Sequence, residues 1–341
     1  MKFTPLKIGA SAATLCLIGV GTWAKITLPN RIKTEIDTAI TTNCPSCKWG
    51  TNQIQVGYFP PKIILIAPRI IGGNPHATGY DAVADRVSVV FRIRSIFSKG
   101  VEIKEIFFDS PKVIVTEGDI RSPRTSNTQA AQIKGTPFSL SETKVKNGEF
   151  TYIRVHAGKH ATLHVTDIQG QIEALGTTPD LVESKTRATA DGHLEQKGKF
   201  QLAIELPLFS DEFSLKIDLH LIEQPLHELN SYFETNDGIK FSGTVHDGRS
   251  SITIHKRKMK QTVQAKYSQL DVHFESTKER SGLSAFFSNL GTSLKLHESS
   301  MKNKPKEQAR TVEIERGNDE TIFKFIFRGM EDAALKIAKG D

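Results

Sequence analysis

Apolar and polar residues alternate with a period of two along much of this chain, and this pattern limits the folds that it can adopt. Successive side chains of a β-strand point to opposite faces, so each such run predicts a strand with one apolar face. Residues 86–94, 199–206, 213–221 and 267–276 all show the alternation. The apolar positions expected to line one face are Val87, Val89, Phe91, Ile93, Phe200, Leu202, Ile204, Phe213, Leu215, Ile217, Leu219, Leu221, Leu270, Val272 and Phe274.

Short sequences that favour tight turns punctuate these runs. Asn-Gly and Asp-Gly pairs suit the two-residue turns that connect antiparallel neighbours. We therefore expect a mainly β protein built as a long antiparallel meander. The expected turns are Gly72–Pro75, Lys146–Gly148, Asp191–Gly192, Asn236–Gly238 and Asp247–Gly248.

The N-terminus carries an uncharged, largely apolar stretch from Ile8 to Ala24. As a helix it would reach about 26 Å, close to the lower limit for crossing a bilayer core. The stretch is either a cleaved secretory signal or a retained anchor, and Thr22-Trp23-Ala24 is only a fair cleavage site because Trp23 precedes the terminal alanine. We favour a retained transmembrane helix, with the rest of the chain outside the cytoplasm.

Three segments space their apolar residues as helices do. Residues 30–42 predict a short amphipathic helix, and residues 281–296 and 320–340 predict two more, whose apolar stripes either cap the sheet or rest on a membrane. Arg121–Gly135 and Ser299–Arg310 are polar and aperiodic, which is typical of linkers. The expected division is a membrane anchor (1–29), a first β-groove segment with its leading helix (30–120), a flexible linker (121–136), a main antiparallel β segment (137–276) and a C-terminal helical region with a linker (277–341).

Cys44 and Cys47 form a C-x-x-C motif, which serves redox chemistry, half of a zinc site or a local disulfide. A redox motif places its first cysteine at a helix N-terminus, whereas here the expected helix precedes Cys44. A zinc site needs four ligands, and the one other cysteine lies in the apolar N-terminal stretch. The motif therefore favours a disulfide in an oxidising compartment. We predict no metal and no cofactor.

Histidine and basic clusters offer two further candidate sites. His156, His160 and His164 are spaced by four, but the sequence between them suggests a hairpin, and residues four apart on a strand are about 13 Å apart. We interpret them as surface histidines. The basic run His255–Lys260 lies between two strand-like segments and contains no aromatic residue for base stacking, so it predicts a solvated hairpin end rather than a nucleic-acid site.

Charge and motifs also bear on function. The net charge is +7 and the isoelectric point is about 9.1, which suits contact with anionic lipid head groups or nucleic acid as well as a solvated basic surface. The sequence lacks a glycine-rich phosphate loop, a G-x-S-x-G elbow and a paired-carboxylate motif in a catalytic setting. The chain is therefore expected not to be an enzyme.

Several phrases in order along the chain resemble the AsmA-like family of bacterial envelope proteins. A single N-terminal membrane helix comes first, and the family's recurring strand phrases follow. The closing phrase "IFKFIFRGMEDAALK" also fits. The matching segments are Val101–Asp119, Phe138–Phe150, Leu221–His246, Val263–Phe274 and Ile322–Lys336.

This resemblance implies a long, twisted antiparallel sheet curled into an open groove with an apolar inner face. It also implies a single-pass inner-membrane protein whose bulk lies in the periplasm and which binds the acyl chains of membrane phospholipids, in lipid transport or envelope homeostasis. The alternative is a non-enzymatic scaffold for outer-membrane biogenesis, with envelope-assembly proteins as partners. Both alternatives exclude nucleic acid as a partner.

Overall fold

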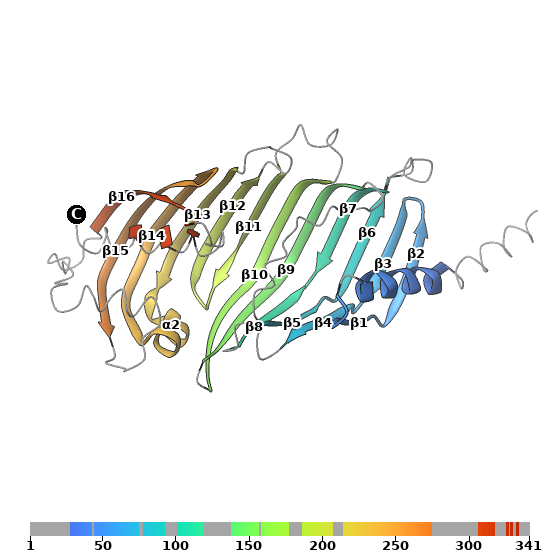
Figure 1. Cartoon of the computed structure of the whole chain (residues 1–341), viewed down its shortest axis with the longest axis horizontal. Helices are drawn as coiled ribbons and strands as arrows, with labels where there is room; N and C mark the ends of the chain where they lie inside the picture. Colours follow the sequence, from blue (N-terminus) through green and yellow to red (C-terminus); the bar gives the residue numbers. More distant parts are fainter. Residues whose placement is uncertain are drawn as a thin grey trace, which may run out of the picture.

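A computed structural model describes residues 28–42, 44–74, 78–92, 101–118, 138–156, 158–176, 186–206, 214–274 and 306–317, and the positions 325, 326, 328, 329, 332 and 333. In this part of the chain, sixteen strands form one sheet. The strands lie side by side in a long, twisted ribbon (Figure 1). Neighbours are antiparallel except where β9 pairs with β7 and β8. The expected mainly β, largely antiparallel fold is confirmed.

The N-terminal strands are short pieces of longer, bent strands. β1, β3, β5 and β7 are each followed after two residues by a second piece, β2, β4, β6 and β8, which pairs with a different neighbour. The bounds are β1 (Lys48–Gly50), β2 (Gln53–Tyr58), β3 (Pro61–Ile66), β4 (Arg69–Asn74), β5 (Thr78–Val83), β6 (Arg86–Phe91), β7 (Val101–Asp109) and β8 (Lys112–Glu117).

A line of backbone irregularities crosses these bent strands. Ala67, Ser110 and Asn147 all have positive φ, at 48°, 50° and 53°. Hydrogen bonds continue across the line, since Ser110 N donates to Lys146 O at 2.8 Å and Glu149 N donates to Pro111 O at 2.7 Å. Such bulges bend a strand and increase its twist without ending its pairing. The sheet therefore curves along this line while remaining one sheet.

The remaining strands are long and continuous. β9 (Phe138–His156) and β10 (Lys159–Gly176) form the longest hairpin, and β14 (Ile239–His255) and β15 (Lys258–Phe274) form another. The basic run His255–Lys260 is the turn of that second hairpin, as predicted. Between the hairpins lie β11 (Thr186–Leu194), β12 (Gly198–Leu206) and β13 (Ser214–Pro225).

Three of the expected turns are wrong. Lys146–Gly148, Asp191–Gly192 and Asp247–Gly248 lie inside β9, β11 and β14. At Gly192 the glycine lets the neighbouring strand approach closely, because a Cβ there would lie 2.7 Å from the Thr166 carbonyl oxygen. Asn236–Gly238 does end an element, because Gly238 takes the left-handed conformation at the C-terminus of α2 (Asn230–Asp237).

The expected linker Ser299–Arg310 is also partly wrong. Lys306–Glu315 forms strand β16, which pairs with β15 along its whole length. Polar and charged residues suit this position, because an edge strand with an apolar sequence would invite aggregation. The C-terminal region 277–341 is thus not purely helical, while the linker at 121–136 and the helix expected at 281–296 lie outside the described residues.

Helices are few in the described part of the chain. Residues 28–42 form the predicted leading helix, and α2 follows the 3₁₀ turn η3 (Leu226–Leu229). The described positions between 325 and 333 are helical, as expected. None of the described helices is long and apolar enough to cross a membrane. The expected anchor falls almost wholly outside the described residues.

Gly243 provides a test of the backbone geometry. Its φ is 95°, and a Cβ there would lie 2.5 Å from Gln269 O and 2.6 Å from Ser268 O. We expect Gly243→Ala to lower the free energy of unfolding by about 1–3 kcal/mol, because the strained conformation and the close backbone cannot both relax. Gly50→Ala is the matched control, since nothing lies within 4 Å of its added Cβ. Equal effects of both variants in urea denaturation would contradict this geometry.

Candidate functional site

The candidate site is one face of the sheet, built from cross-strand rows of side chains. Directly opposite residues in paired strands share a face, so rows follow from the register. We call the face that carries the following two rows the apolar face. One row runs through Val56, Ile63, Val89, Ile106, Thr143, Ile172, Ala188, Ile204, Ile217, Ile252, Gln261 and Val312. The other runs through Ile54, Leu65, Val87, Phe108, Val145, Gly170, Ala190, Leu202, Leu219, Ser250, Val263 and Arg310.

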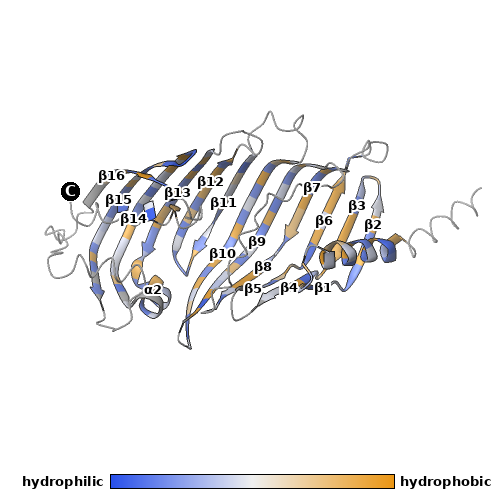
Figure 2. Ribbon diagram, in the orientation of Figure 1, coloured by the Kyte–Doolittle hydropathy of each residue, from blue (hydrophilic) through white to orange (hydrophobic). Residues whose placement is uncertain are grey.

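Most of the apolar face is only partly buried. Val89, Ile106, Ile204 and Leu219 all retain exposed surface, although each lies in the middle of a broad sheet. Figure 2 shows that hydrophobic and hydrophilic residues alternate along the strands, so the hydrophobic ones gather on one face. The described residues provide no second sheet to pack on this face, so its side chains are shielded mainly by their neighbours in the same sheet.

The leading helix 28–42 and α2 pack against limited parts of the sheet. The leading helix 28–42 is tied to β1 by a hydrogen bond from Trp49 Nε1 to Asp37 Oδ1. In α2, the ring of Phe233 packs edge-on against Phe241, with centroids 5.3 Å apart. Tyr232 of α2 lies 5.9 Å from the ring of Tyr152 on β9. Both contacts lie towards one margin of the sheet (Figure 1).

The C-terminal segment closes the β16 end of the apolar face. Phe325 is fully buried and packs with Ile252, Ile254 and Met259, which are 3%, 1% and 1% exposed. Ile254 and Met259 face each other across β14 and β15. This cluster is the best-packed core in the described residues, and it removes the β13–β16 end of the face from solvent.

Gly329 lets this segment approach the sheet closely. A Cβ there would lie 2.8 Å from Oε1 of Gln261 and would clash with Cε of Met259. Gln261 is fully buried in the row and donates from Nε2 to Ser250 Oγ at 3.0 Å. Without a side chain at Gly329, the helix backbone lies directly against Met259 and Gln261, whose side chains would have to shift to admit a Cβ.

The strand register places eight of the predicted groove residues on the apolar face. Phe200, Leu202 and Ile204 of β12 lie directly opposite Leu221, Leu219 and Ile217 of β13. Val87 and Val89 of β6 stand in the same two rows, far across the sheet.

The other predicted groove residues lie outside these rows. Leu215 lies at the closed end, where both it and Ile217 pack against the Phe325 cluster. Leu270, Val272 and Phe274 occupy the end of β15 where Val272 pairs with Phe241, the residue that packs on α2. Phe91 pairs with Ile103 beside a register shift and stands outside the two rows. Ile93 and Phe213 lie outside the described residues.

Sequence reasoning missed part of the face. Ile106 and Phe108 of β7 carry both rows across to β9, and Ile252 and Ile254 anchor the buried cluster. The alternation in "SSITIH" was a sufficient signal for the last two. Phe325 was not part of the predicted C-terminal stripe, so no periodicity indicated it.

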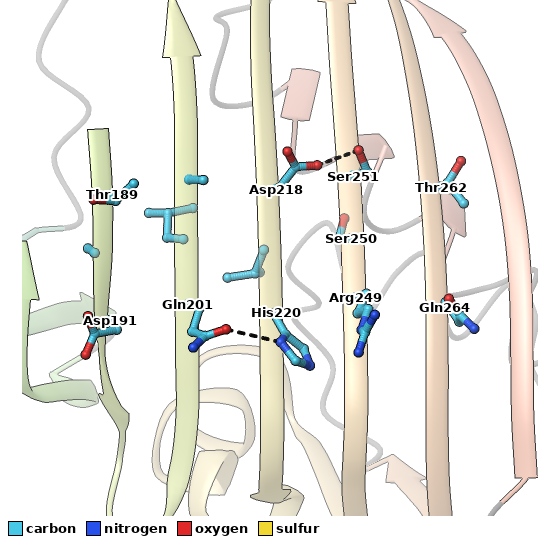
Figure 3. Close-up of a pocket in the computed structure, with 14 residues that line it drawn as sticks. Thr189, Asp191, Gln201, Asp218, His220, Arg249, Ser250, Ser251, Thr262 and Gln264 are labelled. Carbon is cyan, nitrogen blue, oxygen red and sulfur yellow. Dashed lines mark hydrogen bonds between the residues drawn. The ribbon is translucent and has the colours of Figure 1, made fainter. Parts of the chain in front are cut away.

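The opposite face of the sheet is polar and carries a shallow hollow of about 690 Å³ over β11–β15. Figure 3 shows its polar side chains projecting from neighbouring strands. His220 Nδ1 and Gln201 Oε1 are 3.3 Å apart, and Ser251 Oγ donates to Asp218 Oδ1 at 2.6 Å. These contacts satisfy side chains within a solvated surface. The polar residues of this face that line the hollow are Thr189, Asp191, Gln201, Asp218, His220, Arg249, Ser251, Thr262 and Gln264, and its lining also includes Ala203 and four residues of the apolar row, Ala190, Leu202, Leu219 and Ser250.

Ion pairs stabilise the carboxylates of this polar face. Hydrogen bonds from Lys216 and Ser251 hold the pKa of Asp218 below its ordinary value. The pKa of Asp247 is also lowered, because hydrogen bonds from Arg249 and His220 outweigh the opposing effect of burial. These groups are therefore charged at neutral pH, and the face as a whole favours water.

The cysteine candidates form a structural disulfide, and the histidine candidates His160 and His164 are exposed on the surface. Cys44 and Cys47 form a disulfide, with Cα atoms 5.3 Å apart, and both sulfurs contact the Tyr80 hydroxyl. His160 and His164 lie on the same strand, β10, and His164 Nδ1 is 3.2 Å from Thr151 Oγ1. Within the described residues, His, Cys, Asp and Glu side chains form no group of three or more able to hold a metal ion.

The sequence was compared with protein-family profiles and with curated protein sequences. No protein-family profile matches the chain, and no curated protein sequence is significantly similar to it.

The contact of the C-terminal segment is testable at Gly329. We expect Gly329→Val to detach the segment, because the added side chain collides with Met259 and Gln261. Hydrogen–deuterium exchange should then rise at residues 325–333, and Phe325→Ala should do the same by leaving a cavity that costs about 3–5 kcal/mol. Gly50→Val is the control, since Gly50 has open space around it. Unchanged exchange in both test variants would show that the segment is held elsewhere.

Proposed function

We propose that this chain binds lipid acyl chains on the apolar face of its sheet, as an inner-membrane-anchored periplasmic protein that contributes to phospholipid transport or envelope homeostasis. The observation that carries the proposal is the continuity of two largely apolar rows from β2 to β16, with their middle only partly buried by the described residues. The resemblance to AsmA-like proteins and the apolar N-terminal stretch support the same function.

The dimensions of the face suit this role. From β2 to β13, where the C-terminal segment begins to cover the face, the path crosses eight strand-to-strand steps, which at ~4.8 Å each makes about 38 Å. A lipid tail occupies about half of the ~30 Å hydrocarbon core of a bilayer. The uncovered part of the face is therefore long enough for two tails in succession, or for one tail to move along it.

The chemistry of the face suits acyl chains rather than a polar ligand. Leu202, Ile204, Ile217 and Leu219 form an aliphatic block in which every cross-strand pair is apolar. Each tail methylene removed from water there would contribute about 0.8 kcal/mol. The head group would remain at the margin of the sheet, where water and charged residues can solvate it.

A charge placed in the aliphatic block should prevent lipid binding. We expect Leu202→Asp in the full chain to reduce co-purified phospholipid at least tenfold, because a tail would have to desolvate the carboxylate. Ala203→Asp is the matched control, since it adds the same charge to the next residue of β12, on the polar face. Leu202→Ala tests the same position without a charge and should reduce lipid less.

The measurement is quantitative mass spectrometry of lipids in protein purified under identical conditions. Circular dichroism establishes that each variant keeps its strands. Equal lipid content in Leu202→Asp and Ala203→Asp, or no lipid in the unaltered protein, would contradict the proposal.

A second candidate is a scaffold for outer-membrane assembly that recruits proteins by strand addition. It is favoured by β2, a strand at one end of the sheet whose sequence QIQVGY carries no charge to oppose pairing. A photo-crosslinker at Gln55 would then give one defined protein adduct, whereas crosslinkers on the apolar face would give none to lipid.

A further inference from the structure

The tip of the β2–β3 hairpin exposes the most solvent-accessible large hydrophobic side chain in the described part of the molecule. Phe59 is 93% exposed and its neighbour Tyr58 is 42% exposed. Tyr58 pairs with Pro61, so Phe59 and Pro60 form the turn itself. Two consecutive prolines restrict the backbone beside the aromatic ring, which lowers the entropy lost when the ring is held in one place.

The surroundings of the tip are amphipathic. The aliphatic stem of Lys62 lies over Gly57, its cross-strand partner, in the pair next to Tyr58 and Pro61. An exposed aromatic ring beside a lysine is the composition found where proteins enter the interface of a bilayer, because the ring occupies the boundary and the lysine reaches the phosphates. A single exposed Phe alone would not indicate a partner.

The position of the tip supplies the second observation. β2 ends one branch of the sheet, and the leading helix 28–42, whose Asp37 accepts a hydrogen bond from Trp49 of β1, lies at this same end of the molecule (Figure 1). The apolar stretch Ile8–Ala24 precedes that helix in the sequence by a few residues. The apolar rows also begin here, at Val56 and Ile54.

We propose that the β2–β3 tip is a membrane-contact site, at which Phe59 and Tyr58 insert into the head-group region of the bilayer. The partner is the lipid surface, and the contact brings the β2 end of the apolar face to the membrane. The inference rests on the proposed function only in treating Ile8–Ala24 as an anchor. Contact at the tip does not require that lipid occupies the apolar face.

The contact can be read with an environment-sensitive fluorophore at position 59. The full chain carrying Cys16→Ser and Phe59→Cys is labelled with NBD and reconstituted into vesicles of phosphatidylethanolamine and phosphatidylglycerol. Cys44 and Cys47 are joined as a disulfide and do not take the label. The control is Lys260→Cys in the same background, because Lys260 is 64% exposed on β15, at the other end of the sheet.

We expect the label at 59 to shift its emission to shorter wavelength in vesicles and to be quenched at least twofold more by nitroxide-labelled lipid than the label at 260. Equal quenching at the two positions would overturn the proposal. A blue shift at 59 without lipid quenching would also overturn it, since it would show that a protein or a second copy covers the tip. The assay reports on the tip and not on the lipid content of the protein. A negative result at position 59 would therefore leave the acyl-chain proposal standing, and a protein without bound lipid would leave the tip proposal standing.

Discussion

The exposure of apolar side chains on one face of a single-layer sheet is the constraint on which the rest of this structure depends. Strands that bury one face normally do so against a second sheet or a layer of helices. Here the described part of the chain supplies only short helical segments, and these pack near the margins and the β16 end. The hydrophobic free energy of the central rows is therefore incompletely realised by the described residues, which leaves a driving force for binding another apolar molecule.

The two faces of the sheet differ in polarity, and each contributes to the architecture. On the polar face, ion pairs and hydrogen bonds such as Asp218 with Ser251 keep carboxylates charged and solvated. Exposed pairs of this kind contribute little to stability, but they prevent the sheet from burying its second face. The bulges at Ala67, Ser110 and Asn147 then curve the sheet without interrupting the rows. Curvature and one-sided polarity together produce a surface suited to one apolar ligand along its length.

The sequence predicted which residues share the apolar face better than it predicted where the strands begin and end. Alternation in β12 and β13 identified Leu202 and Leu219 as neighbours on one face, because period two follows directly from strand geometry. Local sequence signals failed where tertiary contacts decide the structure. Lys146–Gly148 looks like a turn, yet β9 continues through it because β10 pairs on both sides of the bulge, while β7 pairs before it and β8 after it. The polar stretch at Lys306–Glu315 is a strand only because the edge of β15 was available. Phe325 is buried by a contact with Met259 that lies 66 positions away, which no periodicity encodes.

The central claim is that lipid tails touch one face of the sheet and not the other. A photo-crosslinking amino acid at Leu219, compared with the same amino acid at the adjacent His220, tests this in intact cells, because successive residues of β13 point to opposite faces of the sheet. The account predicts phospholipid adducts from position 219 and none from position 220. Adducts from both positions in equal amount, or a protein adduct in place of lipid at 219, would contradict it.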